Sequence, residues 1–415
     1  MIMIESSEKE ERRNFILNAI EGVFYSGTAG FLSTQTTLPA VAQVLGGDTT
    51  TIGLIPLIGF AGWFLPQLLT VRILHRYPVR KDFVFWVGVP QRFSLLLIAV
   101  AILIFASEQP VIALNMFLFL YIVNQLLTGL STPAWYDMMS KVTPQYRRGR
   151  LLGFRTAVGT LIALGTGLLL TVVLAHVRYP LNYAFIFFGA FFLQMCSLLV
   201  VRQIREAPTP GRAVTEHSEI SIAMLRSVLQ SDSNFRHFVV VCIFLTSATM
   251  SNAFFIGYGF SKYHLSKEFI GQWTMVMMAG QIIGSLLMGY IGDRYGYRRA
   301  LFIASLCIIL TVVTALFFQV PMFYGVVFLF LGMNLGMDMM SRFNMTIEIA
   351  PDDRRPVYVA LLNTIVAPFY LLSLAAGVLI KSTGYEGIFI LSALFAIGAM
   401  GWLFLRVRDP RDIHV

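Results

Sequence analysis

The segment GYIGDRYGYRR, residues 289–299, lies between two long apolar runs and decides how the rest of the chain is interpreted. It combines one aspartate, three arginines and three glycines where one predicted helix ends and the next begins. A weaker copy, HRYPVRK, occupies residues 75–81, so that Arg76 and Arg294 stand 218 positions apart. A loop motif that recurs at about half the chain length predicts two related halves.

A second pair of loops repeats at a similar distance. TPQYRRGR at 143–150 corresponds to APDDRRPV at 350–357, and Arg147 and Arg354 stand 207 positions apart. These loops follow the fourth apolar run of each half, as the first pair follows the second run. The two offsets together predict duplicated halves of six membrane-spanning helices each.

The composition suits a lipid environment. Of the 415 residues, 57% are hydrophobic and 13% are charged, whereas an ordinary soluble domain has roughly 25% charged residues. A bilayer core of about 30 Å is crossed by about 20 apolar helical residues, so the sequence predicts an all-α integral membrane protein with twelve transmembrane helices. The apolar runs lie at 14–42, 51–74, 83–106, 111–140, 150–175, 182–202, 237–260, 269–292, 299–318, 322–348, 356–380 and 386–406.

The positive charge is concentrated in alternate loops. With the N-terminus placed in the cytoplasm, 24 of the 31 lysines and arginines fall in cytoplasmic segments. Basic residues accumulate on that side of membrane proteins, so the net charge of +9 reflects topology and does not indicate a nucleic-acid partner. We therefore expect a multi-pass protein of the plasma membrane, the inner membrane in a bacterium, with both termini in the cytoplasm.

The predicted bundles are separated by the longest hydrophilic stretch. We expect a cytoplasmic tail at 1–13, a six-helix bundle at 14–202, a linker at 203–236, a second bundle at 237–406 and a short tail at 407–415. Apolar residues between Ile220 and Leu229 fit a short amphipathic helix at the membrane surface. A flexible linker is the alternative.

At these loops the sequence resembles the major facilitator superfamily. That family carries a motif of the form G-x-x-x-D-R-x-G-R-[RK]-[RK] after its second span, often repeated after the eighth. The second copy here is the better match, with Tyr297 departing, while the first copy has His75 and Pro78 in place of the aspartate and glycine. The resemblance implies two pseudo-symmetric six-helix bundles around a central cavity, alternating access by rocking of the halves, and no cofactor.

The loop residues have a physical role that does not depend on the family. An aspartate at a helix end beside arginines, near the start of the next helix, can form charge-assisted bonds that hold one conformation. Charges that merely set the topology are the alternative for the last two arginines of the motif. The gating candidates are Asp293, Arg294, Gly289, Gly296, Arg298, Arg299, Arg76, Arg80, Lys81, Asp137, Arg147, Arg148, Arg354 and Arg355. For Asp137 we expect a salt bridge with the neighbouring Arg147 or Arg148, and Arg155 as a further member of that network.

Polar residues inside the predicted spans form the second set of candidates. An ionisable side chain at the bilayer centre costs about 2.5 to 3.5 kcal/mol, so each needs a partner, water or a function. Most fall in spans one, four, seven, ten and eleven, whereas spans three, six, nine and twelve look almost purely apolar and lipid-facing. The cavity and coupling candidates are Glu21, Asn18, Tyr25, Asn124, Gln125, Asn252, Asn334, Asp338, Arg342 and Asn363.

Glu21 stands out among them. It shares one helix face with Asn18 and Tyr25, and a glutamate in a partly wet cavity can load and release a proton. A structural pair with an arginine is the alternative. Asp338 and Arg342 stand four residues apart and can pair on one face, either as a structural ion pair or as a substrate site.

The function expected first is secondary active transport of a small molecule, with proton-coupled export of an amphiphilic compound. Uptake of a sugar or another nutrient is the runner-up, and a non-transporting receptor or scaffold is the rival from another class. An enzyme is disfavoured because all six histidines fall in loops or at span ends, and no phosphate-binding G-x-x-x-x-G-K-[ST] motif is present. The three cysteines offer neither a disulfide framework nor a metal site, and we expect a monomer whose partners are substrate, protons and lipid.

Overall fold

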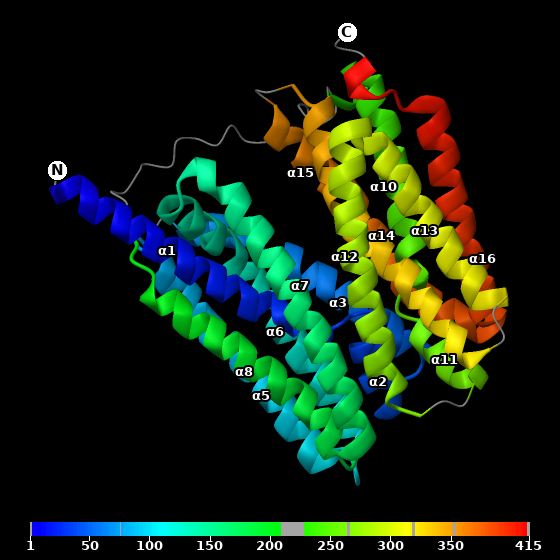
Figure 1. The fold of residues 1–415 in the computed structure, drawn as a ribbon. Coiled ribbons are helices and arrows are strands. Elements are labelled where there is room, and N and C mark those ends of the chain that lie inside the picture. The colour runs from blue at the N-terminus through cyan, green and yellow to red at the C-terminus, as the bar shows by residue number, and fades with distance from the viewer. Residues whose placement is uncertain are drawn as a thin grey trace. The chain divides into compact units, whose positions relative to one another are not determined.

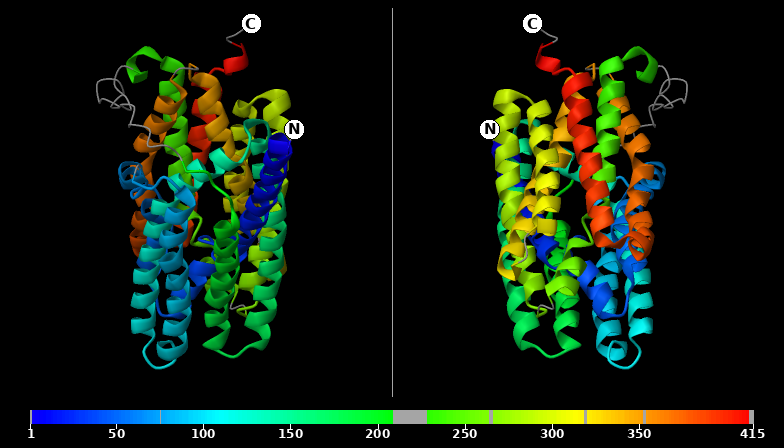
Figure 2. Two further views of the ribbon diagram at one scale, coloured as in Figure 1. Left: turned by 90° about the vertical axis from the view of Figure 1, so that its left-hand side faces the viewer. Right: turned by 90° about the vertical axis from the view of Figure 1, so that its right-hand side faces the viewer.

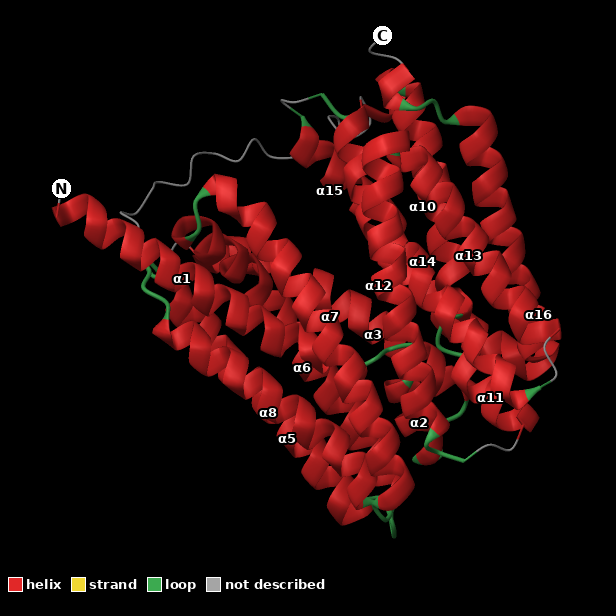
Figure 3. Cartoon of the chain, viewed as in Figure 1, coloured by secondary structure: helices red, strands yellow, loops and turns green. Residues whose placement is uncertain are grey.

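The computed structural model describes residues 2–74, 76–208, 228–263, 266–317, 320–351 and 354–412. Every regular element in these ranges is a helix (Figure 3). Within them, nine helices are long and apolar enough to cross a membrane, one of them a 50-residue run that contains two expected spans. Shorter helical pieces lie where the first two spans are expected, so the all-helical membrane fold is confirmed and twelve spans are consistent with it.

The first half begins earlier and is less continuous than expected (Figure 1). Helix α1 starts at Ile2, so most of the predicted tail is helical, as its run of Glu, Lys and Arg favours. The first span is interrupted after Gly27 rather than continuous from 14 to 42. The helices are α1 (Ile2–Gly27), η1 (Thr28–Gly30), α2 (Thr37–Val44), α3 (Thr49–Phe64), α4 (Gln67–Leu74), α5 (Arg80–Phe105), α6 (Pro110–Val142), α7 (Gln145–His176) and α8 (Leu181–Gln203).

The second half repeats this interrupted pattern. The last two predicted spans are two helices that meet at Gly384, where the backbone is not helical and φ is 72°; both lie within the range labelled α16. The predicted amphipathic helix of the linker lies largely outside the described residues. The helices are α10 (Ser233–Ala248), η2 (Thr249–Ser251), α11 (Phe255–Tyr263), α12 (Phe269–Tyr295), α13 (Tyr297–Phe317), η3 (Pro321–Tyr324), α14 (Gly325–Ile349), α15 (Arg355–Val366), η4 (Ala367–Tyr370), α16 (Leu371–Arg406) and η5 (Pro410–Asp412).

The chain divides into two compact units between α8 and α10. Within the first unit the helices run alongside one another, with α5 packed on both α6 and α8 (Figure 2). Each half of the sequence contributes one short segment to the unit formed mainly by the other half. Lys267–Met275, from the second half, belongs to the first unit, and Asp48–Pro56, from the first half, belongs to the second unit. The predicted boundaries of the bundles themselves remain a prediction.

Specific polar contacts hold these two segments. In the first unit, the buried hydroxyls of Thr36 and Thr274 lie 2.7 Å apart. In the second unit, Lys381 donates to Asp48 over 2.6 Å. This hydrogen bond holds the pKa of Asp48 well below its usual value, so the pair is present at neutral pH and is lost only as the pH falls through that lowered pKa.

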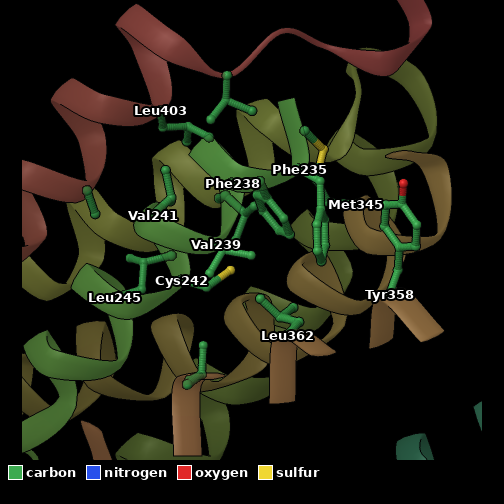
Figure 4. Close-up of a cluster of buried hydrophobic side chains, with 14 of the residues drawn as sticks. Phe235, Phe238, Val239, Val241, Cys242, Leu245, Met345, Tyr358, Leu362 and Leu403 are labelled. Atoms are coloured by element: carbon green, nitrogen blue, oxygen red, sulfur yellow. The ribbon is translucent and has the colours of Figure 1, made fainter. Parts of the chain in front are cut away.

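A large apolar cluster fills one end of the second unit (Figure 4). Phe235 and Phe238 of α10 belong to it and are fully buried, and the ring centre of Tyr358 on α15 lies 4.4 Å from that of Phe235, with the two rings tilted by 52°. Lipid tails are as apolar as these side chains, so the cluster contributes mainly through close packing rather than removal of water.

Helices α12 and α14 approach each other through glycine on both sides. A Cβ atom on Gly280 or Gly284 of α12 would meet a backbone oxygen of α14 at 2.3 or 2.2 Å. The same holds in reverse for Gly332 and Gly336, at 2.0 and 2.3 Å. Gly280 and Gly284 form a G-x-x-x-G sequence, which is typical of close packing between membrane helices, and α14 carries a matching G-x-x-x-G.

Candidate functional site

The first unit buries Glu21 in a set of donors from three other helices. Its side chain forms an ion pair with Arg155 of α7 and is only 4% exposed. The Ser197 hydroxyl of α8 donates to its Oε1 over 3.0 Å, and the Trp135 indole of α6 donates to its Oε2 over 3.3 Å. The Arg155 guanidinium also lies over the Trp135 ring, 4.4 Å from its centre. Both oxygens of the carboxylate are therefore satisfied inside the bundle.

A second guanidinium, that of Arg92 on α5, lies in the same core. Arg92 is 4% exposed, and its described hydrogen bonds all go to neutral oxygens, on Gly88, Gln91 and Gln194. The ring of Tyr25 lies 5.9 Å from it. No carboxylate pairs with Arg92 among the described residues. The described residues around Glu21 thus include two buried guanidinium groups, of Arg92 and Arg155, and the single carboxylate of Glu21.

These contacts correct the expectation that the third and sixth spans are apolar scaffold. Helix α5 contributes Gln91, Arg92 and Ser94, all buried, and α8 contributes Gln194 and Ser197. An arginine inside a predicted span was the available sequence signal for this cluster. Its position alone does not reveal that it faces the bundle interior.

The amide candidates of α6 bond to neighbouring helices. Asn124 donates to the carbonyl of Gln91 over 2.8 Å and to the Ser94 hydroxyl over 3.0 Å. Gln125 donates to the carbonyl of Gly59 over 3.2 Å. These are interhelical bonds, of the kind that holds membrane helices together.

Asn18 behaves differently from its neighbours on α1. It is fully buried, yet neither polar atom of its side chain has a hydrogen-bond partner in the structure. Its carbonyl oxygen accepts from Arg155 over 2.6 Å, which ties the α1 backbone to α7 one turn below Glu21. Unpartnered buried amides are costly, so this position is a candidate for ligand or solvent contact.

Among the described residues of the second unit, an ion pair lies inside a span. Asp338 and Arg342 of α14 are joined over 2.6 Å, as their spacing predicts. Arg342 also donates to the Thr246 hydroxyl over 2.6 Å and to the carbonyl of Cys242 over 3.4 Å, both on α10. The two charged side chains are 15% and 11% exposed, so this pair is more accessible than the Glu21–Arg155 pair.

The amides predicted in the second half have separate environments. Asn334 is buried and donates to the carbonyl of Ala304 on α13 over 3.0 Å. Asn252 is buried beside η2, whereas Asn363 on α15 is exposed. Only Asn334 therefore has a defined interhelical contact.

The loop candidates of the first unit form a charged network around Asp137. Its carboxylate pairs with Arg80 over 2.6 Å and with Lys141 over 3.2 Å. The expected partner Arg148 instead donates to backbone carbonyls of the α6–α7 turn, and Arg155 belongs to the Glu21 pair. The salt bridge expected for Asp137 is present, but its partners are Arg80 and Lys141 instead of Arg147 or Arg148, because the end of α6 faces α5 and not the loop that follows it. Arg155 is not a member of this network.

Glu206 was not predicted for this network. Its carboxylate accepts the backbone N–H groups of Arg80 and Lys81 over 3.0 and 2.7 Å, and Lys141 lies 3.3 Å away. It thereby caps the first turn of α5, where a negative charge is favourable. The signal was a glutamate just after the sixth span.

In the second unit the motif residues contact aromatic rings and backbone. Asp293 accepts from the Tyr297 hydroxyl over 3.2 Å and has no ion-pair partner among the described residues, and Arg294 donates to the Tyr290 hydroxyl over 3.0 Å. Gly296 has a φ of 90°, which only glycine adopts easily. Gly289 has open space around it. The exposed basic candidates are Arg76, Arg299, Arg354 and Arg355, and Arg147 is half-buried.

The described residues contain no group of three His, Cys, Asp or Glu side chains that could hold a metal ion. A model of the Major Facilitator Superfamily matches residues 15–262 and 237–414, which together span nearly the whole chain. The chain belongs to the Major Facilitator Superfamily. The resemblance of its loop motifs to this superfamily is thereby confirmed.

Curated relatives that match part of the chain include proteins of Mycobacterium bovis and Mycobacterium tuberculosis, both named as uncharacterized. Each is 24% identical over 180 residues, which cover 42% of this chain. The matched segment spans about a third of the length of those relatives, 34%.

Solved structures of similar fold are themselves transporters. A D-xylose-proton symporter aligns with a TM-score of 0.75 at 14% identity, covering 97% of this chain and 99% of that one. The nucleoside transporter NupG aligns at 0.74 and 13%, covering 95% and 100%. The Escherichia coli fucose:proton symporter FucP aligns at 0.61 and 11%, covering 96% and 100%. At these identities the likeness shows the fold alone.

Membership of the Major Facilitator Superfamily establishes the class of protein. The chain has the multi-pass, all-helical membrane fold of that superfamily. What it carries, in which direction and with which ion is decided by its own residues.

Proposed function

We propose that this transporter is proton-coupled and that Glu21 carries the proton. The observation behind the proposal is the buried pair of Glu21 with Arg155, held by donors from α6 and α8. We further propose a location in the plasma membrane, the inner membrane in a bacterium, with both termini in the cytoplasm, because the basic loops cluster on that side.

Protonation of Glu21 would remove the negative charge from this cluster. A neutral Glu21 no longer balances Arg155, and no carboxylate of the described residues forms an ion pair with Arg92. Two uncompensated guanidinium groups in a low-dielectric core are unfavourable, so α1 and α7 would separate or admit water. A proton binding step that forces a helix rearrangement is what coupling to alternating access requires.

For the substrate we propose contact with Asp338 and Arg342. This pair lies inside a span, is partly accessible and reaches two helices. Around it on α14, the side chains of Met339, Met340 and Phe343 are 60, 51 and 47% exposed. Flexible Met and aromatic side chains suit an amphiphilic substrate, which favours export of such a compound.

Uptake of a sugar or related nutrient is the second candidate. The D-xylose-proton symporter, the fucose:proton symporter and the nucleoside transporter align over at least 95% of this chain. Hydrogen-bonding side chains of the first unit, including Trp63, Gln125 and Thr132, are only half-buried and suit a polar neutral solute. A substrate panel separates the two candidates.

The proton proposal is tested with purified protein in proteoliposomes. Wild-type protein should show substrate-dependent proton movement with a compound from a panel of sugars, nucleosides and cationic amphiphiles. Glu21→Gln should abolish that proton movement while substrate counterflow continues, because the amide cannot release a proton. Glu10→Gln, the same change on the exposed part of α1, is the matched control. Unaltered coupling in Glu21→Gln would refute the role of Glu21.

The substrate contact gives a second prediction. Asp338→Asn should raise the KM for transport by roughly tenfold, as expected for one lost charge-assisted hydrogen bond, with a smaller change in turnover. Asp82→Asn, in the first turn of α5, should leave KM unchanged. A normal KM in Asp338→Asn with lowered thermal stability would make the pair purely structural.

A further inference from the structure

Residues 407–412, which follow α16, pack against the second unit. Val407 and Asp409 are 2% and 9% exposed, and Val407 belongs to the apolar cluster of Figure 4. Asn234, at the start of α10, donates from its side chain to the carbonyl of Arg408 over 3.2 Å and accepts from its N–H over 2.8 Å. The start of the C-terminal tail is thus fixed to the first helix of its own unit.

The first unit makes the same contact after α8. Asn14 donates to the carbonyl of Arg205 over 2.8 Å and accepts from its N–H over 3.1 Å. Ile204 is fully buried, like Val407 in the other unit. The sequence Ile-Arg-Glu at 204–206 therefore corresponds to Val-Arg-Asp at 407–409. The segment after the last helix of each unit is therefore held in the same way, and the two units can be aligned by it as well as by their loop motifs.

In the first unit, Arg80 joins the end of the second span to the fourth. Its guanidinium pairs with Asp137 on α6 and donates to the carbonyls of Leu74 and Tyr77, at the end of α4. The end of a helix carries a partial negative charge, so an arginine at that point is favourable. Arg80 acts here as a clamp between α4 and α6.

The sequence repeat predicts Arg298 as the equivalent clamp, but Arg298 points elsewhere. It donates to the carbonyls of Leu403 and Phe404 at the end of α16, over 3.4 and 2.9 Å. The loop offset of 207 also maps Asp137 onto Asn344, which carries no charge to pair with an arginine. In the second unit, therefore, the arginine at the position equivalent to Arg80 makes other contacts, and the residue equivalent to Asp137 carries no charge.

Arg411 of the C-terminal tail occupies the missing position. Its guanidinium donates to the carbonyls of Gly292 and Asp293, at the end of α12, over 2.8 and 2.9 Å. It also pairs over 3.0 Å with Glu348, one turn beyond Asn344 on α14. The hydrogen bond to Glu348 raises the pKa of Arg411, so its charge is constant. Arg411 joins α12 to α14 as Arg80 joins α4 to α6.

We propose that the C-terminal tail is a working part of the transport cycle, in which Arg411 is a positioning residue that keeps the ends of α12 and α14 together. The loop 293–299 then moves with the second unit as one body. Without this clamp the ends of α12 and α14 separate. The second unit then deforms internally during the transport cycle instead of moving as one body. The inference rests on transport by alternating access, and it is independent of proton coupling and of the substrate class.

The clamp is tested by distance measurement between spin labels on α12 and α14, at the exposed positions Tyr290 and Phe343. In reconstituted protein without substrate, Arg411→Ala should broaden the distance distribution. Arg411→Lys should broaden it partially, since an ammonium cannot bridge two carbonyls and a carboxylate in one plane. Arg408→Ala is the matched control, because the contacts described for Arg408 use its backbone.

The same variants are then compared in transport. Arg411→Ala should lower turnover several-fold and leave KM nearly unchanged, because the clamp acts on the conformational step and touches no substrate. Distance distributions of Arg411→Ala that match the wild type, or an equal broadening in Arg408→Ala, would overturn the proposal. The distances are measured without substrate or proton gradient. The test of the clamp therefore remains valid even if Glu21 is found not to carry the proton.

Discussion

Replacing Arg155 by methionine should lower the free energy of unfolding by about 3 to 5 kcal/mol, the range observed when one partner of a buried ion pair is removed. The Glu21 carboxylate would keep its Ser197 and Trp135 donors but lose the only ion pair described for it. Methionine preserves much of the side-chain volume, so the loss reports on charge rather than on a cavity. Thermal or detergent-induced unfolding of the purified protein measures it.

The double variant Glu21→Gln/Arg155→Met separates charge from packing. It should recover most of the lost stability, because no uncompensated carboxylate remains. Arg150→Met, on the exposed start of α7, should change stability by no more than about 0.5 kcal/mol. If the double variant were as unstable as Arg155→Met, the pair would not be the source of the loss.

Gly332→Leu should be the most damaging change at a helix contact. A Cβ atom there would lie 2.0 Å from the carbonyl oxygen of Met277, which is backbone and cannot rotate away. Helices α12 and α14 would have to separate, at a cost of at least about 1 to 3 kcal/mol. Gly332→Ala should already show part of this loss in the same unfolding assay.

Gly289 supplies the control for this prediction. It lies on α12 near the motif loop, and a Cβ atom there meets nothing within 4 Å. Gly289→Leu should therefore keep stability within about 0.5 kcal/mol of the wild type. Equal losses at Gly289 and Gly332 would mean that the close packing of α12 on α14 does not explain the effect.

The sequence by itself determined the architecture of this protein. A bilayer requires every spanning backbone group to bond within its own helix, so long apolar runs predict helices without any knowledge of contacts. The two loop repeats predicted duplicated halves. Glu21 and the Asp338–Arg342 pair were identifiable because charge inside a span needs a reason.

The tertiary structure alone decided which charges meet. Glu21 and Arg155 are 134 positions apart in sequence, and no local spacing rule connects them. Arg92 of α5 reaches the carbonyl of Gln194 on α8 only because these helices pack together, and Asp137 pairs across to Arg80. Arg411, and not Arg298, makes the contact with the end of α12 that the sequence repeat predicts for Arg298. A long arginine can reach several helices, so its partner depends on helix rotation, and in an almost wholly apolar span the sequence does not determine rotation.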